Sequence, residues 1–152
     1  MGAAFVAALT ASLYIARVPM QPLSAEALRA ARQRWNDMGM KDYEISYLMH
    51  GARYDVEVRD GLVVDLLVDG KPGYSAEWGL YSVDGLFRLL DMELENLSDA
   101  SGPFGQNGQQ TTARVRFNEP FGYVQRYLRS AAPGGKPASI QIIEFTPRPD
   151  NG

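Results

Sequence analysis

Residues 43–68 read YEISYLMHGARYDVEVRDGLVVDLLV, and this stretch decides the fold. Apolar side chains alternate with polar ones in two short runs, and a third, mostly aliphatic run follows. A period of two residues is typical of strands with one buried face. Gly51-Ala52 and Asp60-Gly61 separate the runs, and Asp-Gly is a strong hairpin signal. The stretch therefore predicts a three-stranded antiparallel meander. The residues that define the three runs are Tyr43, Ile45 and Tyr47, then Tyr54, Val56 and Val58, then Leu62–Val68.

A helix is predicted on either side of this meander. Ser24 is a good N-cap and Gly39 a good stop, which predicts a helix over residues 24–38. Ser82 caps a second predicted helix. Both segments repeat apolar residues at intervals of three and four, so each has one face to bury. These apolar faces comprise Leu28, Ala31, Trp35 and Met38 in the first helix, and Leu86, Phe87, Leu90, Leu94 and Leu97 in the second.

Strand patterns resume after residues 98–110, which are rich in Gly, Ser, Gln and Asn and predict a surface loop. Alternation then recurs at residues 113–117, 123–127 and 140–144. The order is helix, three strands, helix, three strands. It predicts an α+β fold, an antiparallel sheet built from two three-stranded sets with helices packed on one face. The repeated unit also suggests an internal duplication, although the two halves share no evident sequence repeat.

Size and composition limit the classes of function. The chain has 152 residues, 45% of them hydrophobic and 22% charged, which fits one folded domain. A net charge of -3 offers no concentrated positive field for a phosphate backbone, so nucleic acid is not an expected partner. The chain has no cysteine, which excludes disulfides, thiol nucleophiles and zinc ribbons.

The N-terminus is apolar, with no charged residue from Gly2 to Ala16. As a helix this segment would span roughly 22 Å, which is short of the roughly 30 Å of hydrocarbon in a bilayer. A cleaved signal peptide would have a basic start and an A-x-A-like site, so a retained anchor is preferred here, with a helix buried in the domain core as the alternative. The predicted anchoring side chains are Phe5, Val6, Leu9, Leu13, Tyr14 and Ile15.

The predicted organisation has four parts. Residues 1–17 form the membrane anchor or uncleaved signal, residues 18–23 a proline-containing spacer, residues 24–147 the single α+β domain and residues 148–152 a tail. Arginines follow the apolar segment, which by the positive-inside rule would keep the domain in the cytoplasm. Most of these arginines belong to the first predicted helix, however, and charges within a folded helix indicate the side of the membrane less strongly.

No set of residues predicts catalysis or metal binding. His50 is the single histidine and stands at a strand end, where a surface position is the more common explanation. Asp91 and Glu95 are one helical turn apart, and solvation on an exposed helix face accounts for them. No P-loop, calcium loop or serine-nucleophile motif is present. We therefore expect a protein that is not an enzyme and has no catalytic residue, metal or cofactor.

Aromatic residues in and near the predicted loops are the remaining candidates, because exposed aromatics often anchor interfaces. Core packing is the expected fate of at least half of the loop aromatics. The possible interface residues are Tyr74, Trp78, Tyr81, Phe104 and Phe121.

Several short motifs occur along the chain: Trp35 and Gly39 with Asp42-Tyr43, then Val56-x-Val58-x-Asp60-Gly61, then Tyr81-Ser82-Val83-Asp84 with Leu86-Phe87, and Phe121-Gly122-Tyr123. Together they resemble a family of uncharacterised small bacterial proteins, commonly secreted or lipid-anchored, known as a domain of unknown function. The matching positions run from Trp35 to residue 145. The resemblance implies an extracytoplasmic α+β domain and supplies no catalytic residues.

These observations predict a non-enzymatic, membrane-tethered accessory or interaction subunit of a bacterial membrane complex. Its expected partners are the membrane and other subunits of that complex, with the domain on the periplasmic side. The alternative is a secreted or periplasmic domain that binds a small molecule or a peptide.

Overall fold

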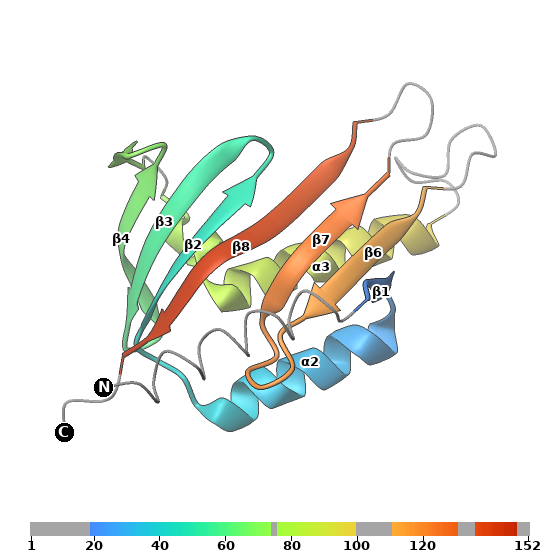
Figure 1. The fold of residues 1–152 in the computed structure, drawn as a ribbon, viewed down its shortest axis with the longest axis horizontal. Helices are drawn as coiled ribbons and strands as arrows, with labels where there is room; N and C mark the ends of the chain where they lie inside the picture. The colour runs from blue at the N-terminus through green and yellow to red at the C-terminus, as the bar shows by residue number, and fades with distance from the viewer. Residues whose placement is uncertain (1–18, 74–75, 100–110, 131–135, 149–152) are drawn as a thin grey trace, which may run out of the picture.

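The computed structural model describes residues 19–73, 76–99, 111–130 and 136–148. They form an eight-stranded antiparallel sheet with two α-helices (Figure 1), so the predicted α+β class is confirmed. Across the sheet the order is β1-β6-β7-β8-β2-β3-β4-β5. The strands are β1 (Gln21–Pro22), β2 (Tyr43–Met49), β3 (Ala52–Arg59), β4 (Leu62–Val68), β5 (Lys71–Pro72), β6 (Ala113–Phe117), β7 (Val124–Arg129) and β8 (Ala138–Pro147). The helices are α2 (Ala25–Met38), the 3-10 helix η1 (Trp78–Tyr81) and α3 (Val83–Ser98).

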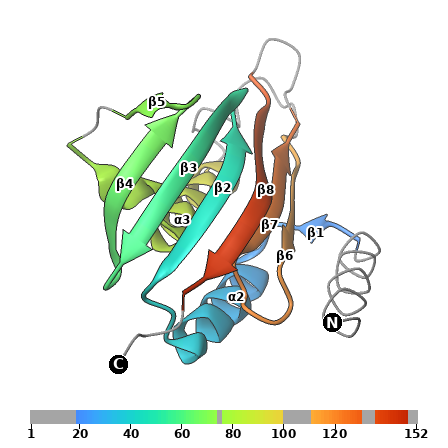
Figure 2. The same ribbon diagram turned by 60° about the vertical axis from the view of Figure 1, so that its left-hand side comes forward.

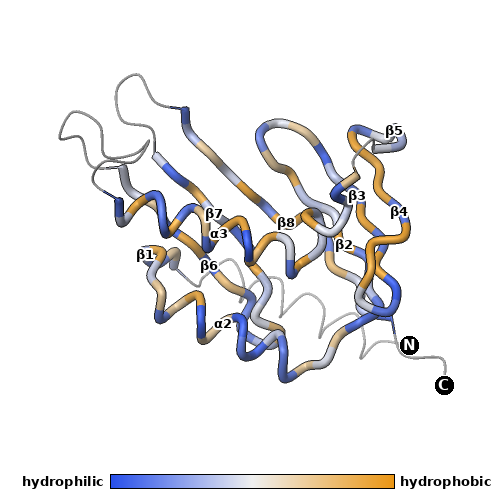
Figure 3. Tube along the Cα trace, turned by 180° about the vertical axis from the view of Figure 1, so that it is seen from behind, coloured by the Kyte–Doolittle hydropathy of each residue, from blue (hydrophilic) through white to orange (hydrophobic). Residues whose placement is uncertain are grey.

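Both α-helices cover the same face of the sheet (Figure 2). Along each helix, hydrophobic and hydrophilic residues alternate (Figure 3), as a helix with one buried side requires. The inward side chains of the central strands complete the core, among them Tyr43, Ile45 and Tyr47, which are all buried. The opposite sheet face is not covered by any described element.

Two-residue turns join the strands of the first set. His50-Gly51, Asp60-Gly61 and Asp69-Gly70 each combine two residues of positive φ, the geometry of the tight turn that matches strand twist. The predicted Asp60-Gly61 hairpin is confirmed. The β2–β3 turn lies one residue earlier than Gly51-Ala52, because Ala52 already pairs with Met49 in the ladder.

Two β-bulges shift the second set away from simple alternation. One bulge lies between Arg116 and Phe117, so the inward partner of Phe117 is Val124 and the predicted strand at residues 123–127 begins one residue later. The other lies opposite Ser46 and Tyr47 and makes Ile143 the extra residue of β8. Ile142 is therefore buried, whereas Ile143 is 46% exposed.

The topology argues against an internal duplication. The strands β6, β7 and β8 lie side by side with β2, β3 and β4 and every neighbouring pair is antiparallel, so the first strands of the two sets run in opposite directions. The two units can be oriented alike, with their first strands pointing in the same direction and their helices behind the sheet. In one unit the later strands then lie to the left of the first strand, and in the other they lie to its right. No rotation superposes the two units.

Part of the predicted spacer belongs to the sheet. Gln21 and Pro22 pair with Val115 and Arg114 of β6, and Leu23 is buried in the core. The predicted N-terminal apolar helix lies outside the described residues, as does most of the predicted loop at residues 98–110. Among the helices that the structure describes, none is both long and apolar enough to cross a membrane.

Candidate functional site

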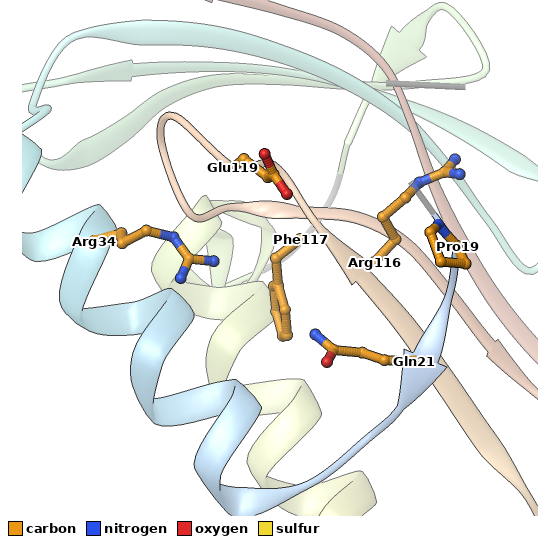
Figure 4. Close-up of a pocket in the computed structure, with 6 residues that line it drawn as sticks. All are labelled: Pro19, Gln21, Arg34, Arg116, Phe117 and Glu119. Carbon is orange, nitrogen blue, oxygen red and sulfur yellow. The ribbon is translucent and has the colours of Figure 1, made fainter. Parts of the chain in front are cut away.

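One cavity lies at the sheet edge where β1, β6 and α2 meet, and we call it the edge pocket. Its volume is about 490 Å³, within the range of small-molecule sites. In Figure 4, the side chains of Arg34 and Gln21 point toward Phe117 from two sides, and the Arg116 guanidinium lies beside Pro19. The lining residues are Pro19, Gln21, Arg34, Arg116, Phe117 and Glu119.

The turn between β6 and β7 holds this pocket together. The Asn118 side chain accepts a hydrogen bond from the Phe121 N–H at 3.0 Å and donates one to the Tyr123 hydroxyl at 3.2 Å. Gly122 brings the turn so close to α2 that an added Cβ would lie 2.2 Å from the Ala31 carbonyl oxygen. The pocket walls formed by α2 and by the end of β6 are thus fixed relative to each other.

The strand β1 closes the other side of the pocket. Its pairing with β6 is reinforced by Arg114, which donates a hydrogen bond to the Met20 carbonyl at 2.7 Å. Leu23 anchors the end of this segment in the core and its N–H donates to the Ala113 carbonyl at 3.0 Å. Gln21 and Pro19 therefore line the pocket because the ladder and the core hold their backbone.

Opposite charges face the edge pocket without neutralising each other. Within the described residues, Arg34 and Glu119 form no ion pair with one another or with another group. The Arg34 Nε is buried and has no hydrogen-bond partner in this part of the chain. A buried N–H without a partner costs free energy, so a ligand oxygen placed there would stabilise the site.

A second site lies on the uncovered sheet face, where a shallow groove of about 320 Å³ crosses β2, β3, β4 and β8; we call it the sheet groove. The register places outward residues of these strands beside one another, Glu44 opposite Glu57 and Asp55 opposite Leu67. Five carboxylates and one arginine line the groove: Glu44, Asp55, Glu57, Asp65 and Glu144 with Arg53.

Hydrogen bonds keep part of this groove charged. The hydrogen bond from Arg53 holds the pKa of Asp55 below its ordinary value, against the opposing effect of partial burial. Ser46 donates a further hydrogen bond to Asp55 at 2.6 Å. Arg59 lies 2.7 Å from Glu57 and 3.7 Å from Glu44, at the end of the groove. Arg148 also pairs with Glu44. Five carboxylates therefore face three arginines, Arg53, Arg59 and Arg148, and the groove keeps an excess of acidic groups.

The same sheet face is basic at its other end. Outward positions of β6 and β7 hold Arg114, Arg116 and Arg126, and Arg116 and Arg126 are directly opposite each other in the register. Between the two ends lie the exposed apolar side chains Leu48 and Leu128, 41% and 37% exposed. The uncovered sheet face is therefore acidic at one end, basic at the other end and apolar between them.

A buried charged cluster ties α3 to the sheet. Arg129 donates to both oxygens of Glu93 at 2.6 Å, and the Tyr127 hydroxyl donates to Glu93 as well. The Arg129 and Glu93 side chains are only 12% and 15% exposed. Burial, followed by the bond to Glu93, raises the pKa of Tyr127 above its ordinary value. Each polar group is satisfied by the others, which is typical of a structural cluster.

The predicted interface aromatics lie in separate places. Trp78 and Tyr81 are half-buried in η1, where Tyr81 stacks on Tyr54 at 5.3 Å. Phe121 packs instead against Tyr123 and Phe145 beside α2. Tyr74, Phe104 and the six predicted anchoring residues lie outside the described residues. The structure therefore does not bring the three described aromatics into one surface.

No cluster of histidine, cysteine or carboxylate groups suited to a metal ion occurs in the described ranges. His50 is exposed in the β2–β3 turn. Comparison of the chain with protein-family models, with curated proteins and with solved structures found no match.

Both cavities escaped prediction from sequence. The sheet groove had a detectable signal, because the polar positions of residues 43–59 alternate and hold three acidic side chains, Glu44, Asp55 and Glu57. The edge pocket had none, since it combines Gln21, Arg34 and Arg116 from three distant segments. Their proximity depends on the pairing of β1 with β6.

Proposed function

We propose that the protein is a membrane-tethered, non-enzymatic accessory subunit that binds a partner of a bacterial membrane complex through its uncovered sheet face. The observation that carries this proposal is the sheet groove, with five carboxylates and one arginine on a face that no described element covers. Surface charge of one sign selects partners of the opposite sign and accelerates their association. The occupant we propose is a lysine- or arginine-bearing segment of another subunit.

The tether completes this proposal. Residues 2–16 are uncharged and apolar, and in the proposal they insert into the membrane while the domain stays on the extracytoplasmic side. The resemblance to secreted and lipid-anchored proteins supports that side. An anchored domain would also gain effective concentration toward a partner in the same membrane.

Fractionation tests the tether. We expect the full chain in the membrane fraction and a shortened chain that begins at Pro19 in the soluble fraction. The shortening keeps β1 and Leu23, so the sheet and the core stay complete. If both chains remained soluble, the tether would be disproved.

Photo-crosslinking in native membranes tests the docking face. A photoreactive residue at Leu67 or Gln141, on the uncovered face, is expected to capture the same membrane protein. Glu95, exposed on α3, is the control position. Glu57→Lys should reduce this capture and Glu95→Lys should not, because only the first reverses a charge in the groove. Equal capture from all three positions would contradict the proposal.

The edge pocket favours a second candidate function, a secreted domain that binds a small molecule or a peptide. Its cavity of about 490 Å³ supports that alternative. Intact-mass analysis of the native protein separates the two, because a secreted protein loses its first residues and a tethered one retains them.

A further inference from the structure

We propose that the edge pocket binds a phosphate ester that also carries an ammonium group, which is the headgroup chemistry of phosphoethanolamine. The basis is one cation, Arg34, and one anion, Glu119, on the walls of one cavity, neither of which has an ion-pair partner among the described residues. A ligand with one charge is attracted by one of these two side chains and repelled by the other. A zwitterion satisfies both.

The phosphate half of the ligand belongs at Arg34. A guanidinium offers several N–H donors in one plane, which suits phosphate oxygens. The buried Nε of Arg34 is one such donor, and it has no hydrogen-bond partner within the described part of the chain. Gln21 adds an amide to this side of the cavity, and Arg116 adds a second positive charge to the lining. The close packing of α2 on Gly122 holds the Arg34 backbone in place.

The ammonium half belongs at Glu119. This residue follows Asn118, whose buried side chain organises the turn, so the position of its backbone is defined. Its carboxylate weakens the binding of a simple anion such as inorganic phosphate. It also makes the pocket selective, because only a ligand that brings its own positive charge gains from it.

The position of the pocket adds a source for this ligand, and this step rests on the proposed tether. Only Arg17 and Val18 separate the apolar segment from Pro19, which lines the pocket. Three extended residue steps reach at most about 10 Å. If residues 2–16 insert into a bilayer, the pocket therefore lies in the headgroup layer, where phosphoethanolamine groups belong to lipid. Free phosphoethanolamine is the other source.

Titration of the full chain in detergent with O-phosphoethanolamine, followed by NMR, tests the pocket itself. We expect Arg34→Gln to weaken binding at least about tenfold, the loss of a charge-assisted contact. Arg29→Gln, exposed on the same helix, is the matched control and should bind normally. Glu119→Gln should weaken phosphoethanolamine but bind inorganic phosphate equally or more tightly.

Three results would overturn the pocket assignment: no saturable binding of O-phosphoethanolamine, an equal loss in Arg29→Gln, or an unchanged preference between the two probes in Glu119→Gln. Circular dichroism of each variant verifies the fold. If Arg34→Gln fails to fold, Arg34→Lys replaces it, because lysine keeps the positive charge and removes the planar set of N–H donors. Arg34→Lys should then weaken the binding of O-phosphoethanolamine, whereas Arg29→Lys should bind it normally.

Binding to vesicles distinguishes a lipid headgroup from free phosphoethanolamine as the ligand, and it tests the pocket and the tether separately. With vesicles of phosphatidylcholine alone or mixed with phosphatidylethanolamine, the tether predicts association with both. The pocket predicts tighter association with the mixture, and loss of that difference in Arg34→Gln and in Glu119→Gln. Binding of O-phosphoethanolamine without any vesicle association would refute the tether and assign the pocket to the soluble ligand. Equal vesicle association without soluble binding would refute the pocket and leave the tether.

Discussion

At the scale of single residues, Gly122 decides how the β6–β7 turn meets helix α2. Its φ is +88°, a conformation that L side chains rarely adopt. A Cβ would also lie 2.2 Å from the Ala31 carbonyl oxygen and 3.0 Å from the Trp35 N–H nitrogen. The sequence alone shows Phe121-Gly122-Tyr123 as a short motif without a structural reason. The structure gives that motif a physical cause, the close approach of two backbones.

The first prediction follows from this contact. Gly122→Ala should lower the free energy of unfolding by about 2–5 kcal/mol, since backbone strain of about 1–2 kcal/mol adds to a steric cost of about 1–3 kcal/mol. Urea denaturation measures the change.

Gly70→Ala is the matched control. Its φ is +78° but nothing lies within 4 Å of an added Cβ, so only the strain of about 1–2 kcal/mol applies. Equal losses in the two variants would show that the contact with α2 does not contribute.

At the scale of secondary-structure elements, side chains from β2 fix the start of α3. The Tyr43 hydroxyl accepts a hydrogen bond from the Val83 N–H at 3.0 Å, and the Tyr47 hydroxyl donates to the Tyr81 carbonyl at 3.0 Å. Ser82 caps the helix through the Gly85 N–H at 3.1 Å. The predicted helix start is therefore confirmed, and the sheet holds it in place.

The other end of α3 is held by charge. Glu93→Gln should destabilise the protein by about 2–3 kcal/mol, because it leaves the mostly buried Arg129 without its counter-charge. Thermal or urea unfolding measures this effect.

Asp91→Asn provides the comparison, since it breaks the exposed pair of Asp91 with Arg32 at 2.6 Å on the same helix. An exposed ion pair contributes about 0–1 kcal/mol to stability, so the free energy of unfolding of this variant should be close to that of the parent protein. A loss as large as that of Glu93→Gln would contradict the distinction between buried and exposed pairs.

At the scale of the whole molecule, buried tyrosines make stability sensitive to alkali. Burial raises the pKa of Tyr123 to about 12, and burial also raises the pKa values of Tyr43, Tyr47 and Tyr127. An unfolded tyrosine ionises near pH 10. The stability that these neutral phenols contribute is complete below about pH 10 and is lost as pH rises toward and beyond about 12.

Urea denaturation at a series of pH values tests this prediction. The free energy of unfolding should fall steadily above about pH 10, and tyrosinate absorbance of the buried groups should appear only with unfolding. In Tyr123→Phe the free energy of unfolding should fall less steeply with pH, whatever the effect of the substitution on stability at neutral pH. A slope identical to that of the parent protein would remove Tyr123 from the explanation.

Local chemistry accounts for what could be predicted. The hairpin at Asp60-Gly61, the caps Ser24 and Ser82 and the apolar helix faces depend on residues a few positions apart, so the sequence displays them directly. The bulges are different. Whether Ile142 or Ile143 is buried depends on the partner strand β2, and both residues are equally hydrophobic.

The sequence by itself determined the α+β class, the two amphipathic helices and the first meander, because short-range periodicity and turn chemistry specify these features. Only the tertiary structure decided the strand order, the opposite hands of the two meanders and the edge pocket. Each of these depends on pairing between segments far apart in the chain, such as Gln21 with Val115 and Tyr47 with Ile142. Such pairings are selected by the packing of a shared core, which no local pattern records.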